Sequence, residues 1–279
     1  MPELPEVETT VRDLRRFLPG RVISGLTWAD WPNMFQTQPP EVFGQLIAGE
    51  EILGLERRAK YIIINLSSEK FLVFHRKMSG NLFWREKDAA PDRFTHVVIA
   101  FKDGSELRFT DMRKFGRVYL FLSQEELDQY MSRLGPEPLT ESFTPEVFTG
   151  LLSGRKGQLK PALLNQNLLV GLGNIYVNEA LFVSRLHPLR NVQSLTAEEQ
   201  EKLYHAIRMV LNKAIDNRGT TLSDYLDGEG KKGRNQEMLF VHDRKGEPCS
   251  ECGTPIVKIT VGQRGTYLCP TCQPDPTIQ

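Results

Sequence analysis

Long apolar runs, an excess of one charge and widely spread cysteines are all missing from this sequence. No stretch approaches about eighteen consecutive apolar residues, the length that a membrane-spanning helix needs. The opening residues MPELPEVETT also lack the basic and then apolar layout of a signal peptide. We therefore expect neither membrane insertion nor export, and we expect a reducing cytoplasmic location. Because 35 Lys and Arg residues balance 35 Asp and Glu residues, any basic surface for a polyanion must be local.

Length and residue patterns in the first half predict a first domain that joins a helix to β-structure. At 279 residues the chain is about twice a usual domain length, which favours two domains. An apolar stripe from Leu4 to Leu18 predicts a first helix, with Pro5 near its start and Pro19-Gly20 at its end. Short β-rich runs joined by turns then fill residues 21–122, which favours a sandwich or a barrel.

The second half of the chain has helical patterns. The segment 134–138, LGPEP, interrupts both periodicities and predicts an interdomain linker. Thr144 precedes Pro145 at the start of one helical segment, and Thr196 with Glu199 forms a capping box for a later one. Residues 217–236 are rich in Gly, Lys and Asp without clear periodicity, so we expect a mobile loop there.

The cysteines form two C-x2-C pairs that are separated by sixteen residues. The four are Cys249, Cys252, Cys269 and Cys272. This spacing suits one tetrahedral Zn²⁺, whereas the alternative of two disulfides is disfavoured in a reducing compartment. Because a closed four-cysteine site has no open coordination position, we expect a structural ion that pins a β-hairpin with Arg264 at its tip.

The first residues offer a nucleophile. Pro2 is small enough to permit removal of the initiator methionine, which would leave a secondary amine at the chain terminus. An α-amino group titrates near pH ~8, so part of it is unprotonated at neutral pH and can attack a sugar aldehyde carbon to form an iminium. Glu3 follows directly, where a carboxyl group can move a proton at the same centre. By itself this dipeptide is a weak signal.

The motifs taken together resemble those of bacterial formamidopyrimidine-DNA glycosylases, which are also DNA-(apurinic or apyrimidinic site) lyases. They are PELPEVETT, RRAKYIIINL, the His75–Gly80 segment, TDMRKFG, LGPEPL, GLGNIYVNEALF and the cysteine hairpin. The match runs from Met1 to Cys272 and needs these motifs in one order. The resemblance implies an α+β multidomain fold, with an N-terminal β-sandwich that carries an N-terminal α-helix and a C-terminal helical helix-two-turns-helix domain with a zinc-bound β-hairpin.

The resemblance also implies domain boundaries and partners. It implies a catalytic β-sandwich domain at 1–133, a linker at 134–143, a helix-two-turns-helix DNA-binding domain with a lesion-capping loop at 144–236, and a zinc-finger β-hairpin at 237–279. The implied protein is a bacterial, cytoplasmic monomer that binds damaged double-stranded DNA and one structural Zn²⁺.

The implied activity is excision of oxidised purines, such as 8-oxoguanine and formamidopyrimidines, followed by strand cleavage through β,δ-elimination. The resemblance makes Pro2 the Schiff-base nucleophile and Glu3 the proton donor. Lys60 matches the proton donor for β-elimination, where its charge would also disfavour protonation of a neighbouring amine. Arg264 matches the arginine of δ-elimination. Glu6 matches a carboxylate that faces the damaged base, although a first-turn glutamate also stabilises a helix N-terminus by itself.

A base in a duplex must be swung out before its sugar can be attacked, and the gap must be filled. Met78, Arg113 and Phe115 match the family's intercalating residues: methionine plugs the gap, arginine meets the orphaned cytosine and phenylalanine wedges into the stack. On their own, Met78 and Phe115 would more often belong to a sandwich core. Further implied DNA contacts are His75, Lys160 and Asn174, although a solvated basic surface would also explain such residues.

The sequence departs from the family's usual pattern at several positions. Arg76-Lys77 precedes Met78 and is expected to add charge beside the wedge. Arg234-Asn235-Gln236 lacks the usual aromatic residue, which bears on the lesion-capping loop, and Asn165 and Asn178 stand where aspartate is common. None of these departures affects the positions that match catalytic residues of the family, which are Pro2, Glu3, Lys60 and Arg264.

Two other functions stay open from the sequence. The endonuclease VIII branch shares the fold and the amine chemistry but favours oxidised pyrimidines, and Leu4 with the Met-Arg-Phe set argues for the purine branch. A non-catalytic DNA-binding zinc protein is a different class, against which the presence of Pro2, Glu3 and Lys60 argues.

Overall fold

A computed structural model describes residues 2–276, and these residues form two compact units. The first unit runs up to Arg133 and includes Asn217–Gln236, whereas the second comprises Leu134–Asp216 and the residues from Glu237 onward. Segment 217–236 therefore packs with the N-terminal unit, and not with the helical domain at 144–236 where we expected it. Among the described residues, no helix is both long and apolar enough to cross a membrane.

The first helix, α1 (Leu4–Leu14), lies where the apolar stripe predicted it. Pro5 occupies the first turn, where its missing N–H group leaves no hydrogen bond unmade, and Glu3 is the N-cap. The stripe residues Leu4, Val7, Val11 and Leu14 are fully buried. The helix ends four residues earlier than expected, because Leu14 is followed by turns that reach Leu18.

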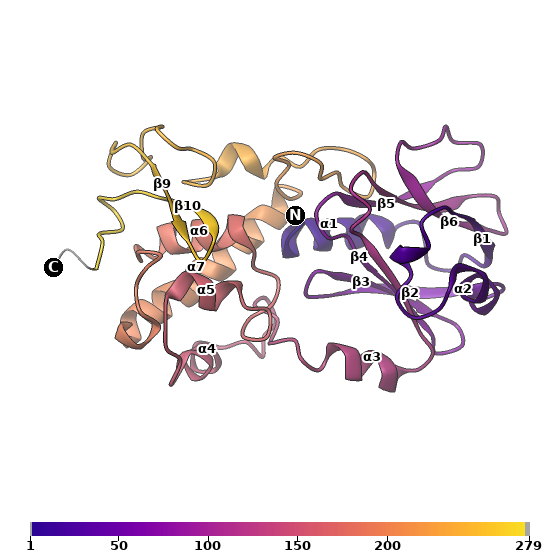
Figure 1. The fold of residues 1–279 in the computed structure, drawn as a ribbon, viewed down its shortest axis with the longest axis horizontal. Coiled ribbons are helices and arrows are strands. Elements are labelled where there is room, and N and C mark those ends of the chain that lie inside the picture. Colours follow the sequence, from indigo (N-terminus) through magenta and orange to yellow (C-terminus); the bar gives the residue numbers. More distant parts are fainter. Residues whose placement is uncertain (1, 277–279) are drawn as a thin grey trace. The chain divides into compact units, whose positions relative to one another are not determined.

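Two antiparallel four-stranded sheets form the predicted sandwich (Figure 1). The first sheet has the order β1 (Ile23–Ala29), β6 (Thr95–Phe101), β7 (Glu106–Asp111) and β5 (Gly80–Arg85). The second has the order β2 (Ile52–Arg58), β3 (Tyr61–Leu66), β4 (Phe71–His75) and β8 (Arg117–Phe121). Helix α1 contacts β2, β3 and β5, so it touches both sheets. The remaining elements of this unit are η1 (Pro32–Met34), α2 (Pro40–Ile47), α3 (Gln124–Met131) and η3 (Asn235–Met238), the last of which crosses into the second unit.

The second unit is mostly helical, as the patterns predicted. Its elements are α4 (Pro145–Leu152), α5 (Leu159–Leu164), α6 (Asn174–Val183), η2 (Val192–Ser194), α7 (Ala197–Asp216), β9 (Val257–Val261) and β10 (Arg264–Leu268). Thr144 caps α4 by accepting a hydrogen bond from the Val147 N–H group. Thr196 and Glu199 make both hydrogen bonds of the predicted capping box ahead of α7. Helix α6 packs against α5, α7 and β10, which explains why seven of its ten residues, Tyr176 to Phe182, are buried.

The C-terminal hairpin differs from the prediction by one position. Its turn consists of Gly262 and Gln263, which have φ angles of 54° and 61°. Two positive φ angles are the geometry of a two-residue hairpin turn that matches the strand twist. Arg264 is therefore the first residue of β10, paired with Val261, and stands beside the tip instead of at it.

Candidate active site and nucleic-acid interface

The N-terminus of α1 brings Pro2, Glu3 and Glu6 together. Glu3 is an extended N-cap residue, and its side chain accepts a hydrogen bond from the backbone N–H of Glu6. In return, the backbone N–H of Glu3 donates to Oε2 of Glu6 at 2.8 Å. Glu3 and Glu6 are 2% and 1% exposed, and Pro2 is also buried. This reciprocal capping box holds the Glu3 carboxylate at the positive end of the helix, next to Pro2.

Lys60 lies in the tight turn between β2 and β3 and is 6% exposed. The preceding residue, Ala59, has a φ angle of 54°. Glu8 of α1 forms an ion pair with Arg57 at 3.0 Å, and Arg57 donates to the carbonyl oxygen of Ala59 at 3.1 Å. The helix that begins at Glu3 is therefore tied to the turn that carries Lys60.

His75 ends β4 and carries a neutral ring at physiological pH. Burial, followed by the charges of Lys77 and Lys60, lowers the pKa of His75 to about 3. Its Nδ1 accepts a hydrogen bond from the backbone N–H of Lys77 at 3.0 Å, and its ring packs edge-on against Tyr61. The expected contact with DNA stays a prediction, in which His75 would act as a neutral group.

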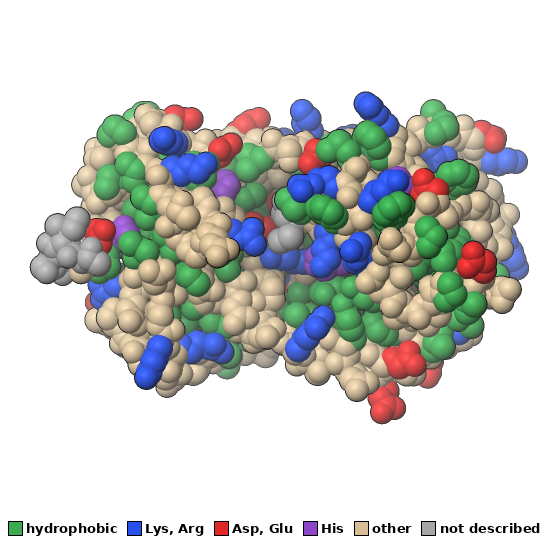
Figure 2. Space-filling view, in the orientation of Figure 1, with side chains coloured by type: hydrophobic (Ala, Val, Ile, Leu, Met, Phe, Trp, Pro, Cys, Tyr) green, Lys and Arg blue, Asp and Glu red, His purple; other side chains and the backbone are tan. Residues whose placement is uncertain are grey.

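Lys77, Arg117 and Arg133 form a local basic surface on the sandwich unit. Burial first, and then the charges of Arg117 and Arg133, lowers the pKa of Lys77, because the three cations lie near one another. Arg133 also lies over the ring of Tyr130, at 5.0 Å. Figure 2 shows Lys and Arg side chains on the displayed face of this unit. A net charge of zero therefore conceals a local positive field that suits a phosphate backbone.

Met78, Arg113 and Phe115 occupy two turns of the sandwich unit, and they are not part of its core. Met78 lies between β4 and β5, and the other two lie between β7 and β8. Met78 and Phe115 are 42% and 44% exposed, and the Arg113 guanidinium lies 4.8 Å from the Phe115 ring. Two large apolar side chains held in solvent beside an arginine are typical of an interaction site.

A buried carboxylate joins these two turns. Asp111, which is fully buried, accepts hydrogen bonds from the Ser79 hydroxyl at 2.5 Å and from the backbone N–H of Arg113 at 3.1 Å. Its second oxygen accepts from the backbone N–H of Gly116 at 2.6 Å. Gly116 is required here, because a Cβ would lie 2.5 Å from the Phe109 ring.

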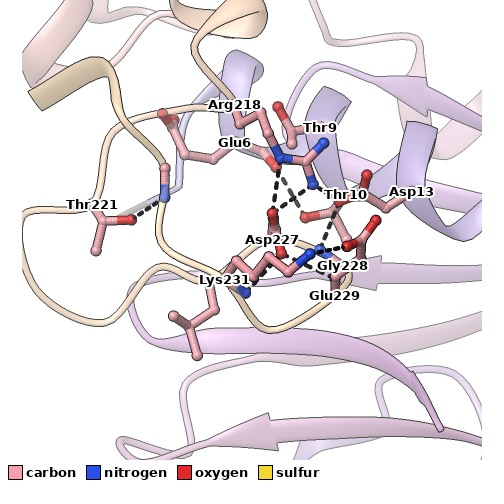
Figure 3. Close-up of polar contacts among 12 residues, drawn as sticks. Glu6, Thr9, Thr10, Asp13, Arg218, Thr221, Asp227, Gly228, Glu229 and Lys231 are labelled. Carbon is pink, nitrogen blue, oxygen red and sulfur yellow. Dashed lines mark hydrogen bonds and ion pairs between the residues drawn. The ribbon is translucent and has the colours of Figure 1, made fainter.

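Residues 217–236 form an irregular loop, as expected, but a dense set of hydrogen bonds holds it against α1 (Figure 3). Arg218 pairs with Asp13 at 2.8 Å and with the fully buried Asp227 at 2.5 Å. Gly228 donates its N–H to Asp13 at 3.0 Å. These contacts give the segment defined partners on α1 and within the loop, and its mobility stays a prediction.

The same loop also reaches the capping box of α1. The backbone N–H of Thr220 donates to Oε1 of Glu6 at 2.7 Å. Because Oε2 of Glu6 accepts from the Glu3 N–H group, one carboxylate bridges the loop and the first turn of the helix. The adjacent Gly219 has a φ angle of 78° and packs so tightly that a Cβ would lie 3.1 Å from Oε1 of Glu6.

Arg76 lies in the turn that carries Met78, but its side chain is not at the surface. Its side chain is buried, with 1% of its surface exposed, and points away from solvent. It donates to Thr10 of α1 at 2.6 Å and to the carbonyl oxygen of Leu226 in the loop at 3.0 Å. The expectation that Arg76 adds charge at the surface is therefore wrong, and of the pair Arg76-Lys77 only Lys77 belongs to the basic surface.

In the second unit, Asn174 and Lys160 hold the hairpin that carries Arg264. Asn174 is the first residue of α6, and its Nδ2 donates to the carbonyl oxygen of Gly265 at 3.0 Å. Lys160 is fully buried and donates to Thr266 at 2.7 Å and to Asn178 at 2.8 Å. The structure therefore gives Lys160 internal partners, and its expected DNA contact stays a prediction, whereas Arg264 is exposed.

The four cysteines meet the geometric requirement for a zinc site. Their Sγ atoms all lie within 4.8 Å of one another, and the cysteines are not joined by disulfides. The Sγ atoms of Cys252 and Cys269 are 3.4 Å apart, and those of Cys249 and Cys272 are 3.9 Å apart. A tetrahedral ion with Zn–S bonds of about 2.3 Å sets its sulfur atoms about 3.8 Å apart, so the four thiolates fit zinc.

Sequence reasoning missed the residues that position these groups. They are Arg76, Ser79, Asn81, Asp111, Glu179 and Arg218. Glu179 is typical, because its buried carboxylate accepts the backbone N–H groups of Phe240, Val241 and His242 at 2.7, 3.0 and 2.9 Å. Burial raises the pKa of Glu179. The only signal in the sequence was a glutamate within an apolar helix, which does not reveal a partner segment about sixty residues away.

Sequence models of three families match successive parts of the chain. The formamidopyrimidine-DNA glycosylase N-terminal domain matches residues 1–118, and the formamidopyrimidine-DNA glycosylase H2TH domain matches residues 134–225. A zinc finger found in FPG and IleRS matches residues 246–274, the segment that holds the four cysteines.

Whole proteins and solved structures agree with these matches. The formamidopyrimidine-DNA glycosylase of Herpetosiphon aurantiacus is 46% identical over 98% of this chain and 100% of that protein. The one from Symbiobacterium thermophilum is 47% identical over 99% of this chain and 90% of that protein. Lactococcus lactis Fpg bound to DNA with Fapy-dG is 35% identical, with a TM-score of 0.90 over 98% of this chain and 100% of that one. The same TM-score relates this chain to Lactococcus lactis Fpg bound to DNA with an abasic site.

Proposed function

This chain belongs to the formamidopyrimidine-DNA glycosylase family, and on that premise we propose that it excises oxidised purines and then cuts the strand through a Schiff base on Pro2. It is a DNA repair glycosylase that binds damaged DNA and holds one structural zinc ion. The observation that carries the assignment of residues is the capping box of α1, which sets the buried carboxylate of Glu3 beside Pro2.

The reaction begins once removal of Met1, which lies outside the described residues, frees the amine of Pro2. The amine attacks C1′ of the extruded nucleotide, and the glycosidic bond breaks as the base leaves with the bonding electrons. Glu3 donates a proton to the sugar as its ring opens, which leaves an iminium on Pro2. Loss of a proton from C2′ then expels the 3′ phosphate, and a second elimination expels the 5′ phosphate. Lys60 and Arg264 transfer protons and bind phosphate in these steps.

The exposed residues of the two turns support extrusion of the base. Met78 and Phe115 enter the duplex as apolar wedges, which removes their exposed apolar surface from water. Arg113 donates hydrogen bonds to the orphaned base. Asn174, at the N-terminus of α6, suits a backbone phosphate because the first N–H groups of a helix attract an anion.

The lesion class is part of the proposal. Lactococcus lactis Fpg has been solved with Fapy-dG in DNA and also with an oxidised pyrimidine in DNA, so binding alone does not separate the two lesion classes. Excision rates would separate them, and we propose that this protein excises the purine lesion faster. The bacterial relatives also support a bacterial cytoplasmic protein that acts on chromosomal DNA.

Borohydride trapping tests this function. The wild-type protein should be trapped covalently on duplexes that contain 8-oxoguanine, and trapping should be slower on thymine glycol. Pro2→Gly, which leaves a primary amine with greater freedom, should reduce trapping strongly, whereas Pro91→Gly at an exposed position is the matched control and should not. Equal trapping of wild type and Pro2→Gly would reassign the nucleophile, and faster excision of thymine glycol would favour the endonuclease VIII branch.

A further inference from the structure

Arg76 is a buried cation with an unusual set of partners. Its guanidinium lies 5.0 Å from the ring of Tyr225, and the described residues place no carboxylate within ion-pair distance of it. Burial lowers the pKa of Arg76 to about 10, which still leaves it charged at neutral pH. A desolvated charge is costly, so hydrogen bonds to the guanidinium must offset that cost.

The first group of these hydrogen bonds closes the turn that carries Met78. Nε of Arg76 donates to the carbonyl oxygen of Gly80 at 2.7 Å, and the N–H of Gly80 donates back to the carbonyl oxygen of Arg76 at 3.0 Å. A Cβ at Gly80 would lie 2.6 Å from that oxygen, so only glycine permits this closure. Met78 is the middle residue of the closed turn.

The second group clamps the middle of the 217–236 loop. Arg76 donates to the carbonyl oxygen of Leu226, and the N–H of Leu226 donates to Oδ1 of Asn81 at 3.0 Å. Asn81 also donates to the carbonyl oxygen of Asp224 at 3.1 Å, and Arg76 donates to Oδ1 of Asn81. The two side chains therefore satisfy the backbone of residues 224–226 as a neighbouring strand would.

A third contact reaches helix α1, where Arg76 donates to the hydroxyl of Thr10 at 2.6 Å. Thr10 lies one turn after Glu6, and Glu6 accepts the N–H groups of Thr220 in the loop and of Glu3 at the helix start. One guanidinium thus joins three parts of the sandwich unit, namely the Met78 turn, the 224–226 segment and the helix that begins at the proposed nucleophile.

We propose that Arg76 and Asn81 are positioning residues that couple the Met78 turn to the 217–236 loop, so that base excision depends on them and cleavage at an existing abasic site does not. This inference rests on the proposed function. An abasic sugar has no base to hold, so its cleavage needs the groups that act on the sugar and the phosphates, which are Pro2, Glu3, Lys60 and Arg264. A damaged base must be held in the site while Met78 fills the gap that it leaves in the duplex. That step needs the 217–236 loop and the Met78 turn to keep a fixed position relative to each other.

Single-turnover rates on two duplexes test the coupling. Arg76→Leu should slow excision of 8-oxoguanine by about tenfold or more, because it removes five donated hydrogen bonds to the turn, the loop, Asn81 and α1. Cleavage of a duplex with a preformed abasic site should stay within about twofold of wild type. Arg76→Lys, which keeps the charge but not the fork of donors, should recover part of the excision rate. Arg93→Leu, at an exposed arginine, is the matched control and should leave both rates unchanged.

Asn81→Leu with amide hydrogen exchange gives a second measurement. The Leu226 amide should exchange faster in this variant, and excision should slow in parallel. If Arg76→Leu and Asn81→Leu lose base excision and abasic-site cleavage equally, the two residues serve only folding and the proposed coupling is wrong. Unchanged excision despite faster exchange of the Leu226 amide would also overturn the coupling. A wild-type protein that is inactive on both duplexes would instead overturn the proposed function, and the coupling with it.

Discussion

The hydroxyl of Ser79 donates a hydrogen bond to the carboxylate of Asp111 across 2.5 Å, although the two residues are 32 positions apart in the chain. The same buried carboxylate accepts the backbone N–H groups of Arg113 and Gly116. It therefore holds the turn that carries Met78 against the turn that carries Arg113. The arrangement of the exposed residues Met78, Arg113 and Phe115 therefore depends on the buried carboxylate of Asp111, which is not itself exposed.

Replacement of Asp111 by asparagine should destabilise both turns. One carboxylate oxygen becomes an NH₂ group that faces donors, so the free energy of unfolding should fall by about 1–3 kcal/mol. Binding to lesion-bearing DNA should also weaken. Urea unfolding and a binding titration measure the two effects. Asp128→Asn, on the exposed side of α3, should change neither, and a fully stable Asp111→Asn protein would contradict the account of this carboxylate.

Met78→Ala and Phe115→Ala should separate binding from folding. Because both side chains are more than two-fifths exposed, the free energy of unfolding should change by no more than about 0.5 kcal/mol. Excision of the damaged base should slow by about tenfold or more, since the gap in the duplex is no longer filled. Met209→Ala, at a methionine that is 41% exposed on α7, is the control. A large decrease in the free energy of unfolding would mean that Met78 and Phe115 stabilise the core, which would contradict their assignment as wedge residues.

Removal of zinc should affect the hairpin and spare the sandwich. A chelator should release one Zn²⁺ per chain and weaken DNA binding, because the thiolates then no longer hold the ends of the hairpin with Arg264. All three tryptophans, Trp28, Trp31 and Trp84, lie in the first unit, so their fluorescence should stay unchanged. Added zinc should restore affinity. If the protein binds DNA with wild-type affinity after verified loss of zinc, the zinc-bound hairpin does not contribute to DNA binding.

His75 should make stability depend on pH. An unfolded histidine titrates near pH ~6.5, whereas the pKa of folded His75 is lowered to about 3, so between these values the unfolded state binds more protons. The free energy of unfolding should therefore fall as the pH drops from about 6.5, by up to about 1.4 kcal/mol per pH unit.

His75→Gln should remove this contribution and make the pH profile less steep, because only the contribution of His242, whose pKa burial lowers to about 4, and of other groups then remains. Urea unfolding at several values between pH 7 and pH ~4 measures it. His205→Gln is the control, because it makes the same replacement at an exposed histidine of α7. An identical profile for wild type and His75→Gln would mean that the ring is protonated as easily in the folded protein as in the unfolded chain.

The sequence predicted those features whose physical cause lies within a few residues. The buried stripe of α1, the cap at Thr144 and the capping box of Thr196 and Glu199 depend on side chains one helical turn apart. The two C-x2-C pairs predicted a cluster of thiolates, because each pair presents its sulfur atoms locally and the intervening hairpin returns the chain. The order of the motifs predicted the family.

The tertiary structure decided which distant groups share a hydrogen bond. Arg76 and Leu226 are 150 positions apart, and Lys160 and Thr266 are 106 apart, so no local pattern could predict that both cations are buried among internal acceptors. The resemblance placed the loop with the helical domain, whereas the folded chain groups it with the first unit, where Asp13 is a partner for Arg218. Local propensity therefore determined the elements and the chemistry of single residues, whereas long-range burial determined which polar groups had to be paired and so which residues hold the site in place.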